Sequence, residues 1–344
     1  MAVLRYTVTL LFPALAVSAV MIGGWWSYHL PLVVFGLIPL LELVLPAPTH
    51  NAEDAVMRER ADHWAFDGLL YLLVAIQVGL VALLVWRTGS GDMAPWEVVG
   101  AALSVGICCG SFGINLGHEL GHRRNAFQQR LAKIALATSL YVHFFVEHNR
   151  GHHVRVATDD DPATSRRGEV LYAFWIRSVV MGYISAFKLE ATRLRRRGKR
   201  VLSLDNEVLT DQLLQAAVVV GVVWYFGPMA AAAWALAAVV GILMLETVNY
   251  IEHYGLARQR RPSGRFEPVR PVHSWNANQL LGRVLLFELT RHSDHHAHPH
   301  RKFPQLRHFD EAPELPTGYP GTMVLATIPP LFFRVMHPRL ATMD

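Results

Sequence analysis

Histidines gathered in short clusters are the residues of this sequence most able to do chemistry. The chain has 18 histidines, and half of them fall in four motifs. These are HELGH at 118–122, EHNRGHH at 147–153, NYIEH at 249–253 and HSDHH at 292–296. Neutral imidazole is the commonest metal-binding side chain, and residues spaced i and i+4 share one face of a helix. The pattern therefore predicts a metal centre.

The number of clustered histidines indicates two metal ions, because a six-coordinate ion would leave three of the nine unused. We expect His148 and His152 to share one helix face, as His118 and His122 do. Imidazole suits zinc, copper, iron and nickel, so the ligand type does not choose the metal. The predicted ligands are His118, His122, His148, His152, His153, His253, His292, His295 and His296.

Four acidic residues lie beside these histidines in the sequence. An all-imidazole site brings no negative charge, and metal-bound histidines commonly donate their second N–H to a carboxylate. We therefore expect Glu119, Glu147, Glu252 and Asp294 to support the ligands by hydrogen bonds.

Other metal sites fit the motifs less well. The HELGH motif matches the zinc-protease pattern, in which Glu119 would be the general base, but a protease needs only one further ligand and leaves most of the clusters unexplained. Glu119-x-x-His122 also matches half of a soluble di-iron bundle, and no other cluster supplies the second half. A histidine-rich metal transporter would have ionisable groups inside its membrane spans, whereas these clusters lie beyond the ends of the predicted spans.

The elements that position the clusters are apolar enough to cross a membrane. The chain is 52% hydrophobic and 17% charged, with a mean hydropathy of +0.25, which argues against a soluble or disordered protein. A spanning helix needs about 20 apolar residues. We expect a shorter apolar stretch at 131–145 to be an interfacial or buried helix. The predicted spans are 7–26, 30–45, 69–86, 98–117, 213–226 and 229–248.

Six spans place both termini on one side of the membrane. Of the 32 lysines and arginines, only Arg87 would then lie on the far side, and an excess of basic residues marks the cytoplasmic face. The sequence thus predicts an all-α integral membrane protein, one membrane domain over 1–344. Its histidine-rich cytoplasmic cap would be formed by 118–211 and 249–344.

Basic residues flank the spans, so the net charge of +5 does not indicate nucleic-acid binding. The densest basic run lies between the second histidine cluster and the fifth predicted span. Such a run attracts anionic lipid or docks an acidic protein. It comprises Arg193, Arg195, Arg196, Arg197, Lys199 and Arg200.

The motifs together resemble the membrane-bound alkane 1-monooxygenases. The matching blocks are NLGHELGHRR at 115–124, EHNRGHHVRVATDDDPATSR at 147–166, NYIEHYGL at 249–256, LTRHSDHHAHP at 289–299 and LPTGYPG at 315–321. The histidine boxes alone are shared with desaturases and aryl-methyl hydroxylases. NYIEHYGL and HSDHHAHP are more specific to alkane hydroxylases.

The resemblance implies a non-haem di-iron centre with two Fe held by the nine histidines, and O₂-dependent hydroxylation of linear alkanes to 1-alkanols. It also implies a bacterial-type inner membrane and electrons from rubredoxin, itself reduced by rubredoxin reductase. The only cysteines, Cys108 and Cys109, cannot hold an iron–thiolate centre, so the donor would be a separate protein docking on the basic run. Hydroxylation of aryl-methyl or fatty-acyl substrates and a zinc intramembrane protease remain the alternatives.

Overall fold

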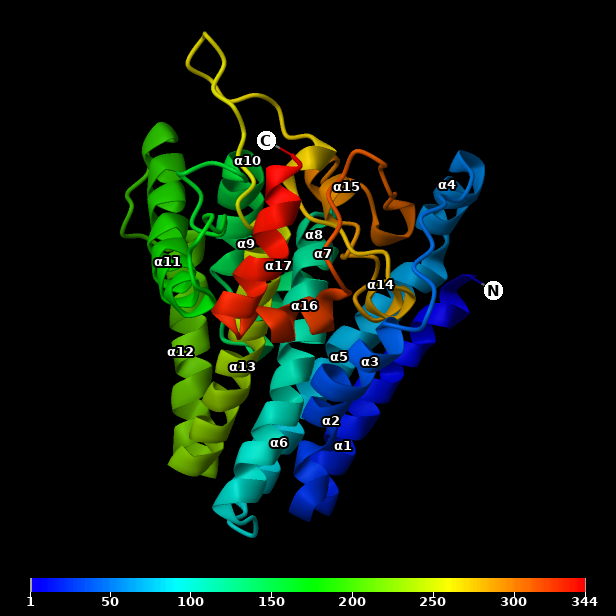
Figure 1. Ribbon diagram of the computed structural model, residues 1–344. Helices are drawn as coiled ribbons and strands as arrows, with labels where there is room; N and C mark the ends of the chain where they lie inside the picture. Colours follow the sequence, from blue (N-terminus) through cyan, green and yellow to red (C-terminus); the bar gives the residue numbers. More distant parts are fainter. Residues whose placement is uncertain (1, 344) are drawn as a thin grey trace.

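The computed structural model describes residues 2–343, and across that range it contains helices and two isolated bridges but no strand. Long apolar helices form one half of the molecule, and α11 (Leu171–Arg196) with mostly shorter helices forms a cap over it (Figure 1). Six helical segments are long and apolar enough to cross a membrane, which confirms the predicted number of spans. They are Val3–Ile22, Gly24–Glu42, Trp64–Gly89, Pro95–Gly121, Glu207–Phe226 and Pro228–His253.

The membrane half is a bundle around α13 (Pro228–His253), which packs on α5 (Trp64–Gly89), α6 (Pro95–Cys108) and α12 (Glu207–Phe226). The first span contains α1 (Leu11–Ile22). The second is formed by α2 (His29–Leu32) and α3 (Ile38–Glu42), joined by a π-helical turn at Val33–Leu37. Apolar side chains on most of these helices point outward, as membrane spans require.

Small residues let α6 and α13 approach closely. A Cβ added at Gly106 would lie 2.6 Å from the Cβ of Val240, and one at Gly241 would lie 2.7 Å from that of Cys109. No larger side chain fits at either position. This close approach is the usual role of glycine between membrane helices, and it fixes the two helices that end at the histidine clusters.

The fourth span changes its winding before it reaches the first cluster. After α6 the chain forms a π-helical turn at Cys109–Ile114 and then α7 (Asn115–Gly121), where His118 lies. A π-helical turn inserts an extra residue per turn and re-aims the side chains beyond it. Single-turn features of this kind occur often at functional sites.

The cap begins with α8 (Ala126–Thr138), α9 (Phe144–Glu147), a π-helical turn at His148–His152 and α10 (His153–Arg155). The stretch 131–145 is therefore not one helix as predicted, because the chain turns at Leu140, whose φ is +52°. As expected, it is not a span.

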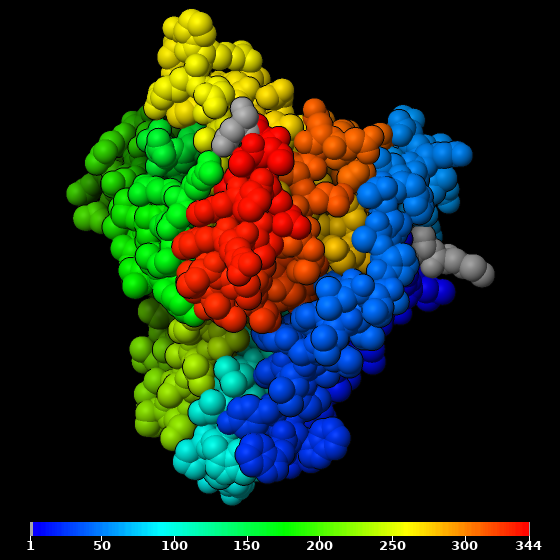
Figure 2. All heavy atoms as spheres, viewed as in Figure 1, coloured from blue at the N-terminus to red at the C-terminus, as the bar shows by residue number. Residues whose placement is uncertain are grey.

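The remaining cap helices cover the end of the bundle. They are α4 (Asp54–Asp62), α11 (Leu171–Arg196), α14 (Leu280–Leu285), α15 (His292–Ala297), α16 (Tyr319–Ala326) and α17 (Pro329–Ala341). Figure 2 shows α17, in red, lying over this face. Its Phe332 ring packs against Tyr250 in a tilted arrangement and against Tyr254 edge-to-face, with ring centroids 5.1 and 4.8 Å away. These contacts hold the end of α13, where His253 lies.

Two span ends differ from the prediction, one because of ion pairs and the other because of a glycine. The fifth span begins at Glu207 rather than 213, because Lys133 forms ion pairs with Glu207 at 2.9 Å and Asp211 at 2.8 Å. The first ends at Ile22 rather than 26, since Gly23 adopts a φ of +69° that stops the helix.

Candidate metal centre

The nine predicted ligands converge in two groups. One group contains five histidines and the other contains four, and in each group the ligand nitrogens all lie within 4.8 Å of one another. The first group is His118, His122, His148, His153 and His295. The second group is His152, His253, His292 and His296.

Contacts between nitrogens within the groups fit shared metal ions. In the five-histidine group, the Nε2 of His148 lies 3.1 Å from that of His122 and 2.9 Å from that of His153. The Nε2 of His295 lies 2.8 Å from that of His118 and 3.1 Å from that of His153. An imidazole nitrogen is either a donor or an acceptor, so such a chain cannot be satisfied by linear hydrogen bonds. Neighbouring ligands at about 2.1 Å from one ion lie about 3.0 Å apart at right angles.

Burial keeps the imidazoles outside the spans neutral, as metal binding requires. Burial lowers the pKa of His122 to about 3, with the Arg123 charge acting in the same direction. It also lowers the pKa values of His148, His153 and His295 well below the usual value. These side chains therefore present lone pairs at neutral pH.

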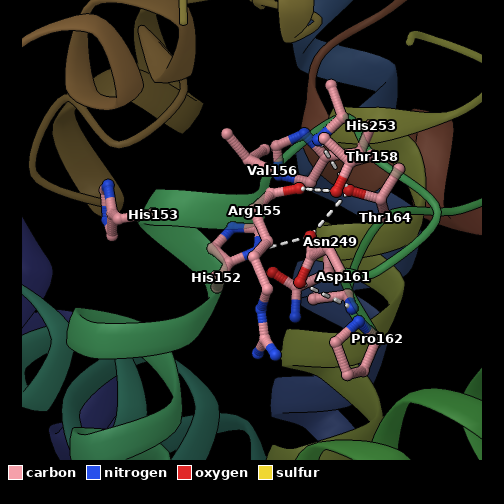
Figure 3. A network of polar contacts seen from close by, with 12 residues as sticks. His152, His153, Arg155, Val156, Thr158, Asp161, Pro162, Thr164, Asn249 and His253 are labelled. Carbon is pink, nitrogen blue, oxygen red and sulfur yellow. Dashed lines mark hydrogen bonds and ion pairs between the residues drawn. The ribbon is translucent and has the colours of Figure 1, made fainter. Parts of the chain in front are cut away.

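The π-helical turn divides one cluster between the two groups. The backbone N–H of His153 bonds to the carbonyl of His148, five residues back, so His153 and not His152 joins the group of His148. Figure 3 shows the rings of His152 and His153 on different sides of the chain. The expectation that His148 and His152 share a face is wrong, because it assumed α-helical winding.

Helix α15 also serves both groups. His292 and His296, four residues apart, lie in the four-histidine group, while His295 points to the other. His253, at the end of α13, completes the four-histidine group although no second histidine lies near it in sequence. Its Nε2 is buried and has no hydrogen-bond partner, as expected for an atom directed at a metal ion.

The carboxylate that supports His152 is one that the sequence analysis missed. Asp161 Oδ2 accepts a hydrogen bond from His152 Nδ1 at 2.9 Å and another from Thr164 at 2.6 Å (Figure 3). Burial favours protonation of Asp161, but the His152 charge and these two hydrogen bonds hold its pKa below the usual value. This bond leaves Nε2 of His152 free for a metal, the arrangement common for histidine ligands.

Of the four acidic residues expected to support ligands, Glu252 is placed against a cluster histidine. Its Oε2 lies 3.1 Å from His292 Nε2, and its Oε1 accepts the Tyr319 hydroxyl at 2.6 Å. Burial raises the pKa of Tyr319 well above its usual value, which keeps the hydroxyl a donor.

The other three carboxylates have different partners. Glu119 accepts from Arg123 and from the backbone N–H of Phe303. Glu147 binds Arg155, and Asp294 binds His298 and Arg301. Throughout residues 2–343 the structure records no hydrogen bond from these three to a predicted ligand, so any support they give is indirect.

Known proteins share this chain's sequence over most of its length. A family described as fatty acid desaturases matches residues 94–325. An alkane 1-monooxygenase of Pseudomonas putida is 41% identical over 329 residues, covering 93% of this chain and 82% of the relative. Alkane 1-monooxygenase 1 of Alcanivorax borkumensis is 40% identical over 331 residues, covering 95% of this chain and 81% of the relative.

The chain belongs to the alkane 1-monooxygenase family.

It is thus a multi-pass membrane monooxygenase, and the similarity extends to an aromatic-substrate relative. The hydroxylase component of the xylene/toluene monooxygenase of Pseudomonas putida is 30% identical over 346 residues, covering 99% of this chain and 90% of the relative. The higher identity to the alkane enzymes supports alkane hydroxylation as the activity of this family member.

An apolar cavity reaches both histidine groups of this alkane 1-monooxygenase family member. Its volume is about 70 Å³, and His118, His148 and His292 line it on the metal side. The rest of its wall is mostly hydrophobic and comes from the first, second, fourth and sixth spans and from α14 and α16. Examples are Phe12, Phe35, Met244, Leu285 and Met323.

The basic run begins in the last turn of α11 and continues beyond it at the surface of the cap. Arg193 pairs with Glu190, and Lys199 pairs with Asp205 at 2.7 Å. Arg196 and Arg197 line an open groove of about 580 Å³, together with Arg150 and Lys188. The run is therefore partly neutralised, and the groove carries its remaining positive charge.

Proposed function

We propose that this protein hydroxylates linear alkanes at the terminal methyl group, using O₂ and a histidine-held di-iron centre. The observation that carries the proposal is the apolar cavity whose inner wall contains histidines of both groups. Such a cavity accommodates the apolar end of an alkane chain and holds it beside both histidine groups. The similarity to alkane 1-monooxygenases supports the same conclusion.

The balanced reaction is RCH₃ + O₂ + 2 e⁻ + 2 H⁺ → RCH₂OH + H₂O. The five-histidine and four-histidine groups would each hold one iron, and when bound these irons supply the reduction of O₂ and the oxidation of the methyl C–H bond. The protein's part is to orient the chain end and exclude water. Phe12, Phe35 and Met244 do this along the cavity.

A substrate panel with metal analysis tests the proposal. Purified protein supplied with a reduced rubredoxin and rubredoxin reductase should convert linear alkanes to 1-alkanols, identified by mass spectrometry, and should contain nearly two irons per chain. Faster turnover of aryl-methyl or fatty-acyl substrates would move the activity to those classes. One zinc per chain, with no alcohol formed, would contradict the proposal.

Glu119 separates this proposal from a zinc protease. Glu119→Gln is expected to keep metal content within about twofold of the wild type, against the roughly 10–100-fold loss for a residue that supports a ligand directly. The reason is that Glu119 contacts Arg123 and Phe303 rather than a histidine. Weakening its ion pair with the buried Arg123 should lower the unfolding temperature, because a buried charge loses one of its two carboxylate partners and keeps only Asp67, 3.4 Å away.

Calorimetry, metal analysis and a peptidase assay on the same preparations check this result. Peptide hydrolysis that disappears in the Glu119→Gln protein would establish the protease instead.

We propose that the histidine-bearing cap faces the cytoplasm of a bacterial-type inner membrane, with both termini on that side. The N and C ends both lie toward the cap in Figure 1, and Arg87 lies in the last turn of α5, at the opposite end. Trp25 and Trp96 pack together there, with ring centroids 5.2 Å apart, as interfacial aromatic residues do.

Electrons are proposed to come from a separate acidic rubredoxin that docks on the basic groove. Reversing two charges, Arg196→Glu with Arg197→Glu, should raise the KM for rubredoxin roughly tenfold at low salt and flatten its dependence on ionic strength, because complementary charge mainly speeds association. Steady-state kinetics across a salt series measure both effects.

The matched control is Arg334→Glu with Arg339→Glu, which makes the same charge change at exposed positions of α17. If both pairs raise the KM equally, the effect comes from net charge and the docking site lies elsewhere.

A further inference from the structure

A small polar cavity lies beside the histidine groups, apart from the apolar one. It has a volume of about 20 Å³ and lies between α9, α11 and α13, with His148 and His152 in its wall. A cavity of this size holds about one water molecule. Its other wall residues include six polar side chains. These are Tyr141, His143, Glu147, Ser178, Glu246 and Asn249.

Two buried polar atoms in this wall lack a partner. His143 Nδ1 and Glu147 Oε2 form no hydrogen bond, and both residues are more than nine-tenths buried. Leaving such an atom unsatisfied costs about 1–3 kcal/mol. Both residues line the cavity, which has room for a water molecule that could bind such atoms.

Glu246 is the acidic group of the cavity that lies within a membrane span. It is 2% exposed and accepts hydrogen bonds from Tyr141 at 2.9 Å, from Ser178 and from Asn249 at 3.3 Å. All three donors are neutral, and the structure of residues 2–343 records no basic side chain paired with Glu246. An ionisable residue that lies within a membrane span and also lines a polar cavity is in the position that proton relays use.

Polar groups connect this cavity to the surface. Pro162 lines both the cavity and the open basic groove. Arg155 donates to Glu147 at 2.7 Å and to Ser185 at 2.8 Å, and both Arg155 and Ser185 line the groove. Water at the groove is therefore separated from the cavity by a short polar layer.

We propose that this polar cavity is the route by which protons enter the reaction, with Glu246 as the buried carboxyl group that relays them. The inference rests on the proposed function, in which each turnover forms one alcohol and one water from O₂, two electrons and two protons. The electrons come from the donor protein, and both protons must come from bulk water. The mostly hydrophobic cavity offers the alkane path, and the polar cavity lies apart from it.

The groups facing Glu246 belong to each of the packed elements. Tyr141, His143 and Glu147 come from the segment before the π-helical turn, Ser178 from α11 and Asn249 from α13. A proton moves from cavity water to a Glu246 oxygen and leaves toward the wall formed by His148 and His152. No covalent bond other than O–H is made or broken in the relay.

Glu246→Gln tests the relay, because glutamine keeps the shape of the side chain and one of its two acceptor oxygens but cannot carry a proton. We expect kcat to fall between about 10- and 100-fold, within the usual range for loss of an acid–base group. The KM for alkane and the metal content should stay unchanged. The solvent deuterium isotope effect on kcat should rise, since proton delivery becomes rate-limiting, and Glu246→Asp should recover part of the rate.

Glu42→Gln is the matched control. Glu42 is also a buried carboxyl group in a membrane span, but it accepts from the backbone N–H of Gly282 and lies outside the polar cavity. Its replacement should leave the isotope effect unchanged.

Wild-type turnover and isotope effect in Glu246→Gln would overturn the relay, as would metal loss in both Glu246 variants, which would make the residue structural. Wild-type protein that forms no 1-alkanol would instead overturn the proposed function, and the relay test would then be run on whichever hydroxylation the protein performs.

Discussion

Replacing His253 with alanine should abolish hydroxylation and at least halve the metal content. His253 is the isolated histidine among the nine, yet it is fully buried and its free Nε2 lies with three other ligand nitrogens. Losing one of four ligands leaves the ion too few protein contacts to stay bound. Metal analysis and product formation on the same preparation measure the result.

His300→Ala is the matched control for this prediction. His300 is exposed and lies four residues after the ligand His296, so its loss should change neither metal content nor activity. Unfolding of the metal-free proteins shows whether His253→Ala still folds. A folded His253→Ala protein with full activity and normal metal content would remove this residue from the site.

Replacing Asp161 with asparagine should weaken metal binding or activity by roughly 10–100-fold, the usual effect of removing a carboxylate behind a histidine ligand. Asp161 fixes His152 with Nδ1 protonated and Nε2 free. Asparagine loses the negative charge, and its amide group can donate to Nδ1 and so favour the tautomer that protonates Nε2. Metal titration with a competing chelator measures the affinity.

Asp159→Asn is the control, since Asp159 is an exposed carboxylate two residues away. Equal metal affinity in the Asp161→Asn protein and the wild type would mean that His152 needs no acceptor, or that it binds no metal.

The spans could be predicted from the sequence because about 20 consecutive apolar residues carry a strong signal. The ends of the spans could not be predicted in this way. Glu207 and Asp211 belong to the fifth span only because Lys133, distant in sequence, pairs with them. Local hydropathy contains no information about such a partner.

The ligand histidines could likewise be proposed from their clustering, while their division between two groups could not. It depends on the π-helical turn at His148–His152, and sequence spacing alone assumes α-helical winding. Asp161 was missed for a similar reason. It lies nine residues after His152 and reaches it through a loop whose Ala157 has a positive φ of 57°, a geometry that no helix spacing predicts.

The two histidine groups share their supports. The π-helical turn with the adjoining His153 contributes to both groups, and so does α15. Each segment has six residues, which is too short for its two ends to move independently. When a first ion orders such a segment, the ligands for the second ion are ordered as well. The conformational entropy of the segment is therefore lost in the first binding step and not again in the second. We therefore expect metal ions to bind to the two groups with positive cooperativity, so that partly loaded preparations are mixtures of full and empty molecules rather than chains with one ion each.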